Sequence, residues 1–328
     1  MFTTANLALI VQALLAIVAG SVGIIAVFYG LNLLVERLPK VWRLRLLPWV
    51  YVGPTVLLLG AYLVFPALRT FYISFFDNRS ENFVGLQNYI FAFTDPDMLI
   101  AFRNNVLWLV LVTVFSVALG LVIAVLVDRV SYEPFAKALI FLPMAISFVG
   151  ASVIWRFIYA YRPEDSAQIG LLNAIVVSLG FEPVGWLVNR TINNFALIVI
   201  MIWLQTGFCM VLLSSAVKGI PKDVIEAARI DGAGEWQIFR RIMVPIIMPT
   251  VTVVTTTVVV LVLKVFDIVF VMTGGMLDTD VIASRMIKEM FNFRDFGRGS
   301  AIAVILLVAV IPVMVANIRR FRQQELSR

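Results

Sequence analysis

The chain has 328 residues, of which 61% are hydrophobic and only 14% are charged, a composition that excludes an ordinary soluble domain. It contains no histidine, which excludes histidine-based acid–base chemistry, histidine metal ligands and histidine proton relays. The formal net charge of +6 is interpreted as a signal of membrane topology and not of nucleic-acid binding.

Long uncharged runs dominate the chain. Crossing a hydrocarbon core of about 30 Å takes about 20 helical residues, and several runs reach this length. Because they lack the alternating pattern of barrel strands, they predict an all-α polytopic membrane protein. The seven transmembrane helices that we expect lie near residues 7–35, 46–68, 104–127, 138–155, 191–217, 242–263 and 299–318.

The first run, residues 7–35, is too long for a signal peptide and has no basic segment before it, so we expect a retained helix. We therefore predict two parts. Residues 1–46 form an extra amino-terminal helix with a cytoplasmic linker, and residues 47–328 form the main transmembrane domain. Basic residues between positions 37 and 45 favour a cytoplasmic loop there. This topology puts the amino terminus outside and the carboxyl terminus in the cytoplasm.

Two segments that this topology places outside have structure of their own. Asp95 and Pro96 predict a turn, and Asp97 is typical of a first helical turn. Residues 170–181 are apolar but too short to span, which favours a helix at the membrane interface. Both segments suit either docking of an extracytoplasmic partner or capping of the helix bundle.

Residues 218–250 form a polar island between two apolar runs, which the topology places in the cytoplasm. Pro221 suits the start of a short helix, and Asp231-Gly232 predicts its end, because glycine adopts the left-handed cap conformation at no steric cost. A second short helix is expected over residues 233–244, until Pro245 interrupts it. The island is either a solvated loop or, given its aromatic residues beside charges, a contact surface.

Polar groups inside the membrane are costly, and their positions indicate candidate sites. Lys264 and Asp267 are three residues apart on the expected sixth helix, so they share a face and either form a structural ion pair or line a hydrophilic cavity. A second set combines aromatic rings with hydrogen-bonding groups, as a sugar site requires, although helix packing explains the small polar members equally well. This set comprises Ser147, Phe148, Trp203, Gln205, Thr206 and Phe208.

The sequence offers little cysteine chemistry and no nucleotide-binding motif. Cys209 is the single cysteine, so no intrachain disulfide forms and a role as a buried hydrophobic residue is expected. The chain contains no phosphate-binding loop of the G-x-x-x-x-G-K-[ST] type. The chain therefore does not bind nucleotide through such a loop.

The island at residues 218–250 carries the motif Glu226-Ala-Ala-x-x-Asp231-Gly232-Ala233. This motif resembles the "EAA" loop of binding-protein-dependent ABC importer permeases. The segments FVGLQNYI, FLPMAISFVGASVIWRFIY and VFDIVFVMTGG are similar to the carbohydrate-uptake, or maltose-type, branch of that family, and the resemblance extends from about residue 47 to the end. Residues 273–300 look most like the α-glucoside permeases, a group that includes glucosylglycerol importers. Met276-Leu277 departs from the Gly-Pro that many relatives have after the glycine pair.

The resemblance implies a permease subunit that forms half of a pore for a sugar or glucoside in a bacterial or archaeal inner membrane. The implied partners are a second permease, two ATPase subunits and an extracytoplasmic solute-binding protein. ATP and Mg²⁺ would be bound by the ATPase subunits, so this chain itself binds no cofactor or metal and is not an enzyme. The residues implied in coupling to the ATPase are Glu226, Ala227, Ala228, Asp231, Gly232, Ala233, Gly234 and Pro245.

Two alternatives come from other functional classes. An ion-coupled secondary transporter would use the pair of Lys264 and Asp267, and its uptake would collapse with the ion gradient instead of with ATP. A membrane-embedded enzyme would need clustered catalytic groups, but the chain has no histidine and no second cysteine. The sequence therefore favours the ABC importer permease.

Overall fold

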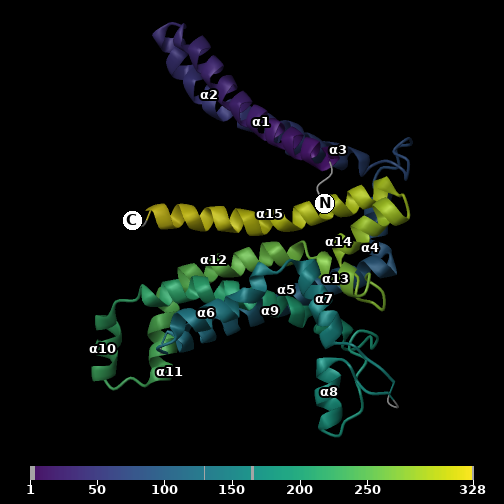
Figure 1. The fold of residues 1–328 in the computed structure, drawn as a ribbon, viewed down its shortest axis with the longest axis vertical. Coiled ribbons are helices and arrows are strands. Elements are labelled where there is room, and N and C mark those ends of the chain that lie inside the picture. Colours follow the sequence, from purple (N-terminus) through teal and green to yellow (C-terminus); the bar gives the residue numbers. More distant parts are fainter. Residues whose placement is uncertain (1–3, 129, 164–165, 327–328) are drawn as a thin grey trace. The chain divides into compact units, whose positions relative to one another are not determined.

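The computed structural model describes residues 4–128, 130–163 and 166–326 (Figure 1). The chain divides into two compact units, one up to Arg69 and one from Thr70 onward. Within the described ranges every regular element is a helix, and an isolated β-bridge joins Phe76 and Phe83. The prediction of an all-α fold is confirmed.

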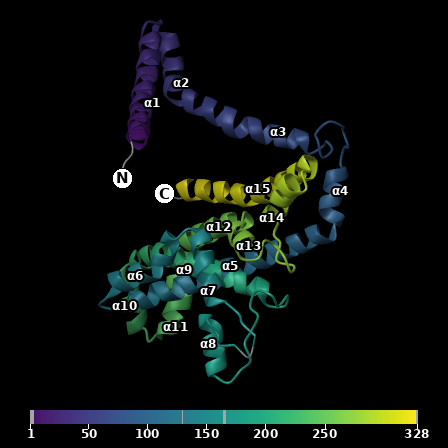
Figure 2. The same ribbon diagram turned by 45° about the vertical axis from the view of Figure 1, so that its right-hand side comes forward.

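The first unit is a helical hairpin. Helix α1 (Thr4–Glu36) and helix α2 (Lys40–Leu59) lie side by side, as Figures 1 and 2 show, and the rings of Phe28 and Tyr51 stack at 6.2 Å. Helix α2 continues through a π-helical segment, η1 (Gly60–Val64), into α3 (Phe65–Ile73). The wider π turn ends two residues before Pro66, which lacks a backbone N–H and would strain a regular α-helix.

The second unit is a bundle of long helices with short helices at its two ends. Its long members are α5 (Pro96–Val127), α9 (Asn193–Lys218), α12 (Val244–Leu263) and α15 (Phe296–Leu326). Its shorter members are α4 (Gln87–Thr94), α6 (Glu133–Phe141), η2 (Leu142–Ala145), α7 (Phe148–Ile158), α8 (Leu171–Ser178), α10 (Lys222–Ile230), α11 (Glu235–Ile238), η3 (Phe239–Met243), α13 (Asp267–Met272), α14 (Ile282–Ile287) and η4 (Lys288–Asn292).

Helices α5 and α9 form the centre of this unit and run in the same direction. At one end, the indole nitrogen of the fully buried Trp108 donates a hydrogen bond of 2.7 Å to Asn194 Oδ1. Further along, Gly120 lies against Cys209 so closely that a Cβ atom at Gly120 would be 2.5 Å from the Cβ of Cys209. Glycine therefore sets the helix spacing. Cys209 is buried and free, as expected.

The expected fourth span is not one straight helix. Helices α6 and α7 meet at a bend of 100°. Pro143 lies in the 3₁₀ turn η2 at the break, and Ser147 starts α7 as its N-cap by accepting a hydrogen bond of 3.0 Å from the Gly150 N–H. Proline and a capping serine thus end one helix and begin the next, where the apolar run alone predicted continuity.

The described residues contain six helices that are long and apolar enough to span a membrane, and seven spans if the bent pair α6–α7 is counted as one. This agrees with the seven spans expected from the sequence. Two local predictions, a helix start near Asp97 and a short helix after Gly170, are also confirmed. Asp95 caps α5 by accepting from the Met98 N–H at 3.1 Å, and the apolar segment after Gly170 forms the short helix α8.

Candidate functional site

The loop between α9 and α12 folds as a short helix, a tight bend and a second helix, as the sequence predicted. Helix α10 ends at Asp231, and Gly232 follows with φ of +81°. The Ala233 N–H donates to the Ala228 carbonyl at 3.0 Å, and the Gly232 N–H donates to the Arg229 carbonyl at 3.0 Å. This pair of bonds is a Schellman motif, which satisfies the last carbonyls of the helix and fixes the direction of the bend.

Side chains lock the two sides of the bend together. Arg229 on α10 pairs with Glu235 on α11 at 3.1 Å. The Gly234 N–H donates to the Gln237 Oε1 at 3.1 Å, which caps the start of α11. The motif glycines and alanines therefore belong to a defined bend whose conformation is specified by hydrogen bonds and an ion pair.

The second helix of the loop does not stop at Pro245. It runs without interruption from Glu235 to Leu263, through α11, the π-helical segment η3 and α12. The expectation that Pro245 interrupts the helix is wrong, because the π turn ends at Met243 and Pro245 lies in the first turn of α12, where a missing N–H is tolerated. The loop is thereby a direct extension of a membrane-spanning helix.

The loop exposes large apolar side chains. Ile230 is 86% exposed and Trp236 is 68% exposed, and the Trp236 ring stacks on Phe239 at 5.5 Å. Ile238 and Ala228, by contrast, are buried and attach the loop to the bundle. An exposed apolar surface of this kind is typical of a contact site.

A cavity of about 640 Å³ lies between the loop and the ends of α5, α6 and α9. Glu226 lines it, and its exposed side chain forms no ion pair within the described part of the chain. The root of the loop is held by Lys218, which pairs with Glu133 at 2.6 Å and with Asp128 at 3.7 Å. Glu133 also pairs with Lys137. The loop is therefore anchored by charges while Glu226 remains available.

A second cavity, of about 360 Å³, lies at the break between α6 and α7. Four of the expected pathway residues line it, together with apolar neighbours: Ser147, Phe148, Gln205 and Asp267. Gln205 is buried, yet its side-chain amide has no hydrogen-bond partner in the described ranges. The cavity thus combines an aromatic ring with unsatisfied polar groups.

The remaining pathway candidates do not line this cavity. The Trp203 ring packs edge-on against Trp155 at 5.8 Å, the Thr206 hydroxyl donates to the Ile202 carbonyl at 2.7 Å, and Phe208 packs against the core. For Thr206 this is the helix packing that the sequence allowed as the other interpretation, and Trp203 and Phe208 also pack inside the bundle.

Lys264 and Asp267 form no ion pair. Helix α12 ends at Leu263, so the two residues are not one turn apart on a continuous helix as expected; Lys264 caps α12 and Asp267 begins α13. Both nevertheless line a small cavity of about 30 Å³ beside the larger one, together with Phe148. The break in the helix separates the charges and leaves both near the same cavity.

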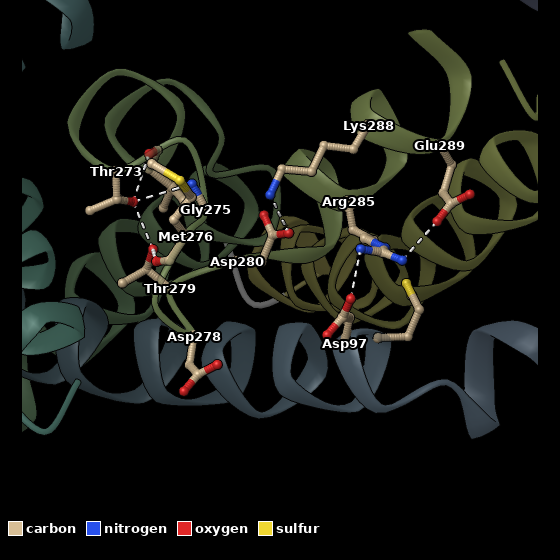
Figure 3. A network of polar contacts seen from close by, with 12 residues as sticks. Asp97, Thr273, Gly275, Met276, Asp278, Thr279, Asp280, Arg285, Lys288 and Glu289 are labelled. Carbon is tan, nitrogen blue, oxygen red and sulfur yellow. Dashed lines mark hydrogen bonds and ion pairs between the residues drawn. The ribbon is translucent and has the colours of Figure 1, made fainter. Parts of the chain in front are cut away.

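The sequence did not predict a polar network (Figure 3) near α13 and α14, which lie at the opposite end of the bundle from α10 and α11 (Figure 1). Asn104 on α5 donates to the carbonyls of Asp278 and Asp280 at 2.7 and 2.8 Å, and the Asp280 carboxylate pairs with Lys288 at 2.7 Å. These contacts fix the irregular segment between α13 and α14 to α5. The adjacent asparagines Asn104 and Asn105, at the start of an apolar run, are the sequence feature that could have indicated buried polar contacts here.

Arg285 is the centre of a second group in the same network (Figure 3). It pairs with Glu289 at 2.9 Å and with Asp97 at 3.0 Å. Glu289 is only 2% exposed, and burial raises its pKa above the ordinary range for a glutamate although the Arg285 guanidinium acts in the other direction. The network therefore contains a buried acid whose ionised form is disfavoured.

Comparison with known proteins agrees with this geometry. A model of the binding-protein-dependent transport system inner membrane component family matches residues 51–326. The osmoprotective compounds uptake permease protein GgtC of Synechocystis sp. is 72% identical over 85% of this chain and 100% of its own length. The α-glucoside transport system permease protein AglF of Rhizobium meliloti is 48% identical over 94% of this chain and 96% of its own.

A solved structure supports the fold. One chain of a bacterial ABC transporter involved in the import of the polysaccharide alginate superposes with a TM-score of 0.73. The match covers 84% of this chain and 95% of that chain at 22% sequence identity. With the family match, this fold and the exposed helix–bend–helix loop at residues 218–250, the chain belongs to the family of inner membrane components of binding-protein-dependent transport systems.

Proposed function

We propose that this chain forms one half of a solute pore and couples it to a separate ATPase subunit. The observation that carries the proposal is the uninterrupted helix from Glu235 to Leu263. Trp236 is exposed at the loop end of this helix. Near the other end of the helix, Leu261 lines the cavity of about 360 Å³ at the break between α6 and α7, which we call the membrane cavity. Movement of the loop is then transmitted to the cavity wall along one rigid element.

In this mechanism α10 docks into a cleft of the ATPase, and Glu226 pairs with a basic group there. The small side chains of Ala227, Ala233 and Gly234 allow close approach of the ATPase. The buried Ala228 packs on the inner side of α10, and Asp231 and Gly232 hold the bend. ATP binding favours an outward-facing cavity, and hydrolysis with product release favours the inward-facing one, because each nucleotide state binds one arrangement better. ATP and Mg²⁺ belong to the ATPase subunits, and this chain performs no catalysis.

The proposed cargo is a small neutral glucoside, such as an α-glucoside or glucosylglycerol. The Phe148 ring offers an apolar face, and Gln205 and Asp267 offer hydrogen-bonding groups to hydroxyls. The Ser147 oxygen accepts its capping bond and still has a proton to donate. The names of GgtC and AglF, which refer to osmoprotective compounds and α-glucosides, support this cargo class.

The proposed assembly contains this permease, a second permease, two ATPase subunits and an extracytoplasmic solute-binding protein. It lies in the inner membrane of a bacterium or archaeon, with the amino terminus outside and the carboxyl terminus in the cytoplasm. The loop at residues 218–250 then faces the ATPase, and the segment between α13 and α14 faces the binding protein.

The test is reconstitution of the purified importer in liposomes with its binding protein. We expect glucosylglycerol or an α-glucoside to stimulate ATP hydrolysis, and uptake to stop without ATP but to continue after ion gradients are collapsed. Uptake that persists without ATP and collapses with an ion gradient would contradict the proposal and favour a secondary transporter. Stimulation by pentoses but not by glucosides would contradict the cargo class alone.

A further inference from the structure

A groove of about 600 Å³ lies between α5 and the start of α9, and it shares no lining residue with the three cavities described above. On α5 its lining residues are spaced i, i+3, i+4, i+7 and i+8, which places them on one helix face. These residues are Arg103, Val106, Leu107, Val110 and Leu111, and the other side of the groove is formed by Arg190, Thr191, Asn194 and Phe195. The groove is basic at one end and apolar along its length.

The position of the charges matches a membrane interface. From Val106 to the end of α5 at Val127 no residue is charged, and at 1.5 Å per residue this stretch is about 33 Å long, about the thickness of a hydrocarbon core. A similar uncharged stretch begins on α9 at Phe195 and ends at Val217. Arg103 and Arg190 therefore both lie at the level of the lipid headgroups, with the apolar part of the groove in the acyl-chain region.

The polar groups at the mouth of the groove are mainly donors. The Arg103 guanidinium donates to the neutral Asn104 Oδ1 at 3.2 Å and has no carboxylate partner in the described ranges. Arg190 is 3.3 Å from the Asp278 carboxylate, which offsets one of the two positive charges. Asn194 is 6% exposed and its oxygen accepts from Trp108, while its NH₂ group has no partner among the described residues. A single negative charge with acceptor oxygens would complete this site.

We propose that the groove binds a phospholipid with an anionic headgroup, its phosphate against Arg103 and Arg190 and an acyl chain along Val106, Val110 and Leu111. The exposed apolar face of α5 continues beyond the groove at Val114, Leu119 and Val122, which gives an acyl chain a continuous apolar surface, and the two arginines at the mouth of the groove favour an anionic headgroup. The bound lipid would contact both α5 and α9, the pair at the centre of the bundle, and would stabilise their packing.

The experiment is native mass spectrometry of the protein purified from membranes with its co-purifying subunits, after equilibration with equal amounts of phosphatidylglycerol and phosphatidylcholine. We expect wild-type protein to retain phosphatidylglycerol preferentially. Arg103→Gln and Arg190→Gln should each lower the ratio of retained phosphatidylglycerol to phosphatidylcholine about fivefold, since each basic group near an anionic headgroup contributes about that factor. Arg162→Gln, an exposed arginine outside the groove, should leave the ratio unchanged.

Two further variants separate this site from a general charge effect. Asp278→Asn removes the carboxylate that competes for Arg190 and tolerates the left-handed backbone at φ +64°, so we expect it to raise the ratio. Val110→Trp fills the groove and should lower the amount of both lipids. Unchanged lipid retention in the arginine variants and in Val110→Trp would overturn the proposal. So would loss of the second permease from Val110→Trp with lipid retention unchanged, because the groove would then be a protein interface.

Discussion

Gly274 and Gly275 have the same left-handed backbone conformation but different surroundings. Their φ angles are +62° and +70°. A Cβ atom at Gly274 would meet nothing within 4 Å, whereas one at Gly275 would lie 2.0 Å from Asp280 Oδ1 and 2.7 Å from Lys288 Nζ. The backbone conformation favours glycine at both positions, but only at Gly275 does the ion pair of the network leave no room for a side chain.

This difference predicts two unequal substitutions. Gly274→Ala should cost about 1 to 2 kcal/mol of stability through its backbone alone. Gly275→Ala should cost about 3 kcal/mol or more, because it also displaces the largely buried Asp280–Lys288 pair. The midpoint of thermal unfolding, followed by tryptophan fluorescence, measures both. Equal midpoints for the two variants would show that the network does not depend on the missing side chain.

Gln205 and Thr206 are adjacent on α9 but have different roles in the structure. The Gln205 amide lines the membrane cavity without a partner, and the Thr206 hydroxyl bonds to its own helix. We expect Gln205→Ala to lower the apparent affinity for the glucoside about fivefold, the effect of one lost hydrogen bond. Thr206→Ala is the control and should leave it unchanged in an uptake assay. The reverse pattern would place the pathway on the other face of α9.

Among the elements, those with a uniform apolar run were predictable from the sequence and those defined by a break were not. The runs at residues 104–127 and 191–217 became α5 and α9; α9 shifts by one or two residues at its ends, whereas α5 begins eight residues earlier, at Pro96. Three features could not be predicted: the bend between α6 and α7, the end of α12 at Leu263 and the continuity through Pro245. A capping serine or a π turn makes either a break or a continuous helix possible at such positions, and packing against the rest of the bundle selects one of them. Contacts of Asn104 with Asp278 and Asp280 link residues more than 170 positions apart, beyond any local pattern.

The segment from α14 to η4 carries a pH-dependent element. Glu289 is buried, and its pKa in the folded protein is raised above that in the unfolded chain. The folded state therefore binds the proton more readily, and stability falls as pH rises from the unfolded pKa, about 4.5, through the raised folded pKa. The ionised form of Glu289 destabilises this segment at neutral pH.

Glu289→Gln mimics the protonated form, so we expect the variant to be more stable than the wild type at pH 7. The difference should shrink as the pH is lowered to about 4, where wild-type Glu289 is itself protonated. Arg285 keeps Asp97 as a partner in the variant. Thermal unfolding of both proteins across this pH range measures the difference in stability. The assignment would be contradicted if the stability of the variant relative to wild type were lower at pH 7 than at pH 4.

At the scale of the whole molecule, the loop at residues 218–250 is, in the proposed mechanism, the part of this chain that contacts the ATPase subunit. Glu226 is exposed and forms no ion pair within the described residues, so replacing it should change folding stability by less than about 0.5 kcal/mol. We expect Glu226→Lys to lower the amount of ATPase subunit that co-purifies at least about tenfold, through charge reversal at the contact. Glu226→Gln should have a smaller effect. Wild-type amounts of ATPase with Glu226→Lys would remove Glu226 from the interface.

Coupling requires that the bend at Gly232 transmit force to the helix from Glu235 to Leu263. Proline at position 232 cannot adopt φ of +81° and removes the N–H that bonds to the Arg229 carbonyl. Because nothing lies within 4 Å of a Cβ at this position, the helix bundle should fold normally while the Schellman motif is lost. Gly232→Pro should therefore lower the amount of solute transported per ATP hydrolysed at least about tenfold.

The matched control is Gly232→Asn, because asparagine tolerates the left-handed conformation and keeps the backbone N–H. We expect it to retain most of the coupling. The two variants differ in backbone conformation at one exposed position, so a ratio that falls only in Gly232→Pro identifies the bend itself as the coupling element. If Gly232→Pro transported solute with the wild-type ratio, the loop would act as a passive tether, and the continuous helix to the cavity would need a different role.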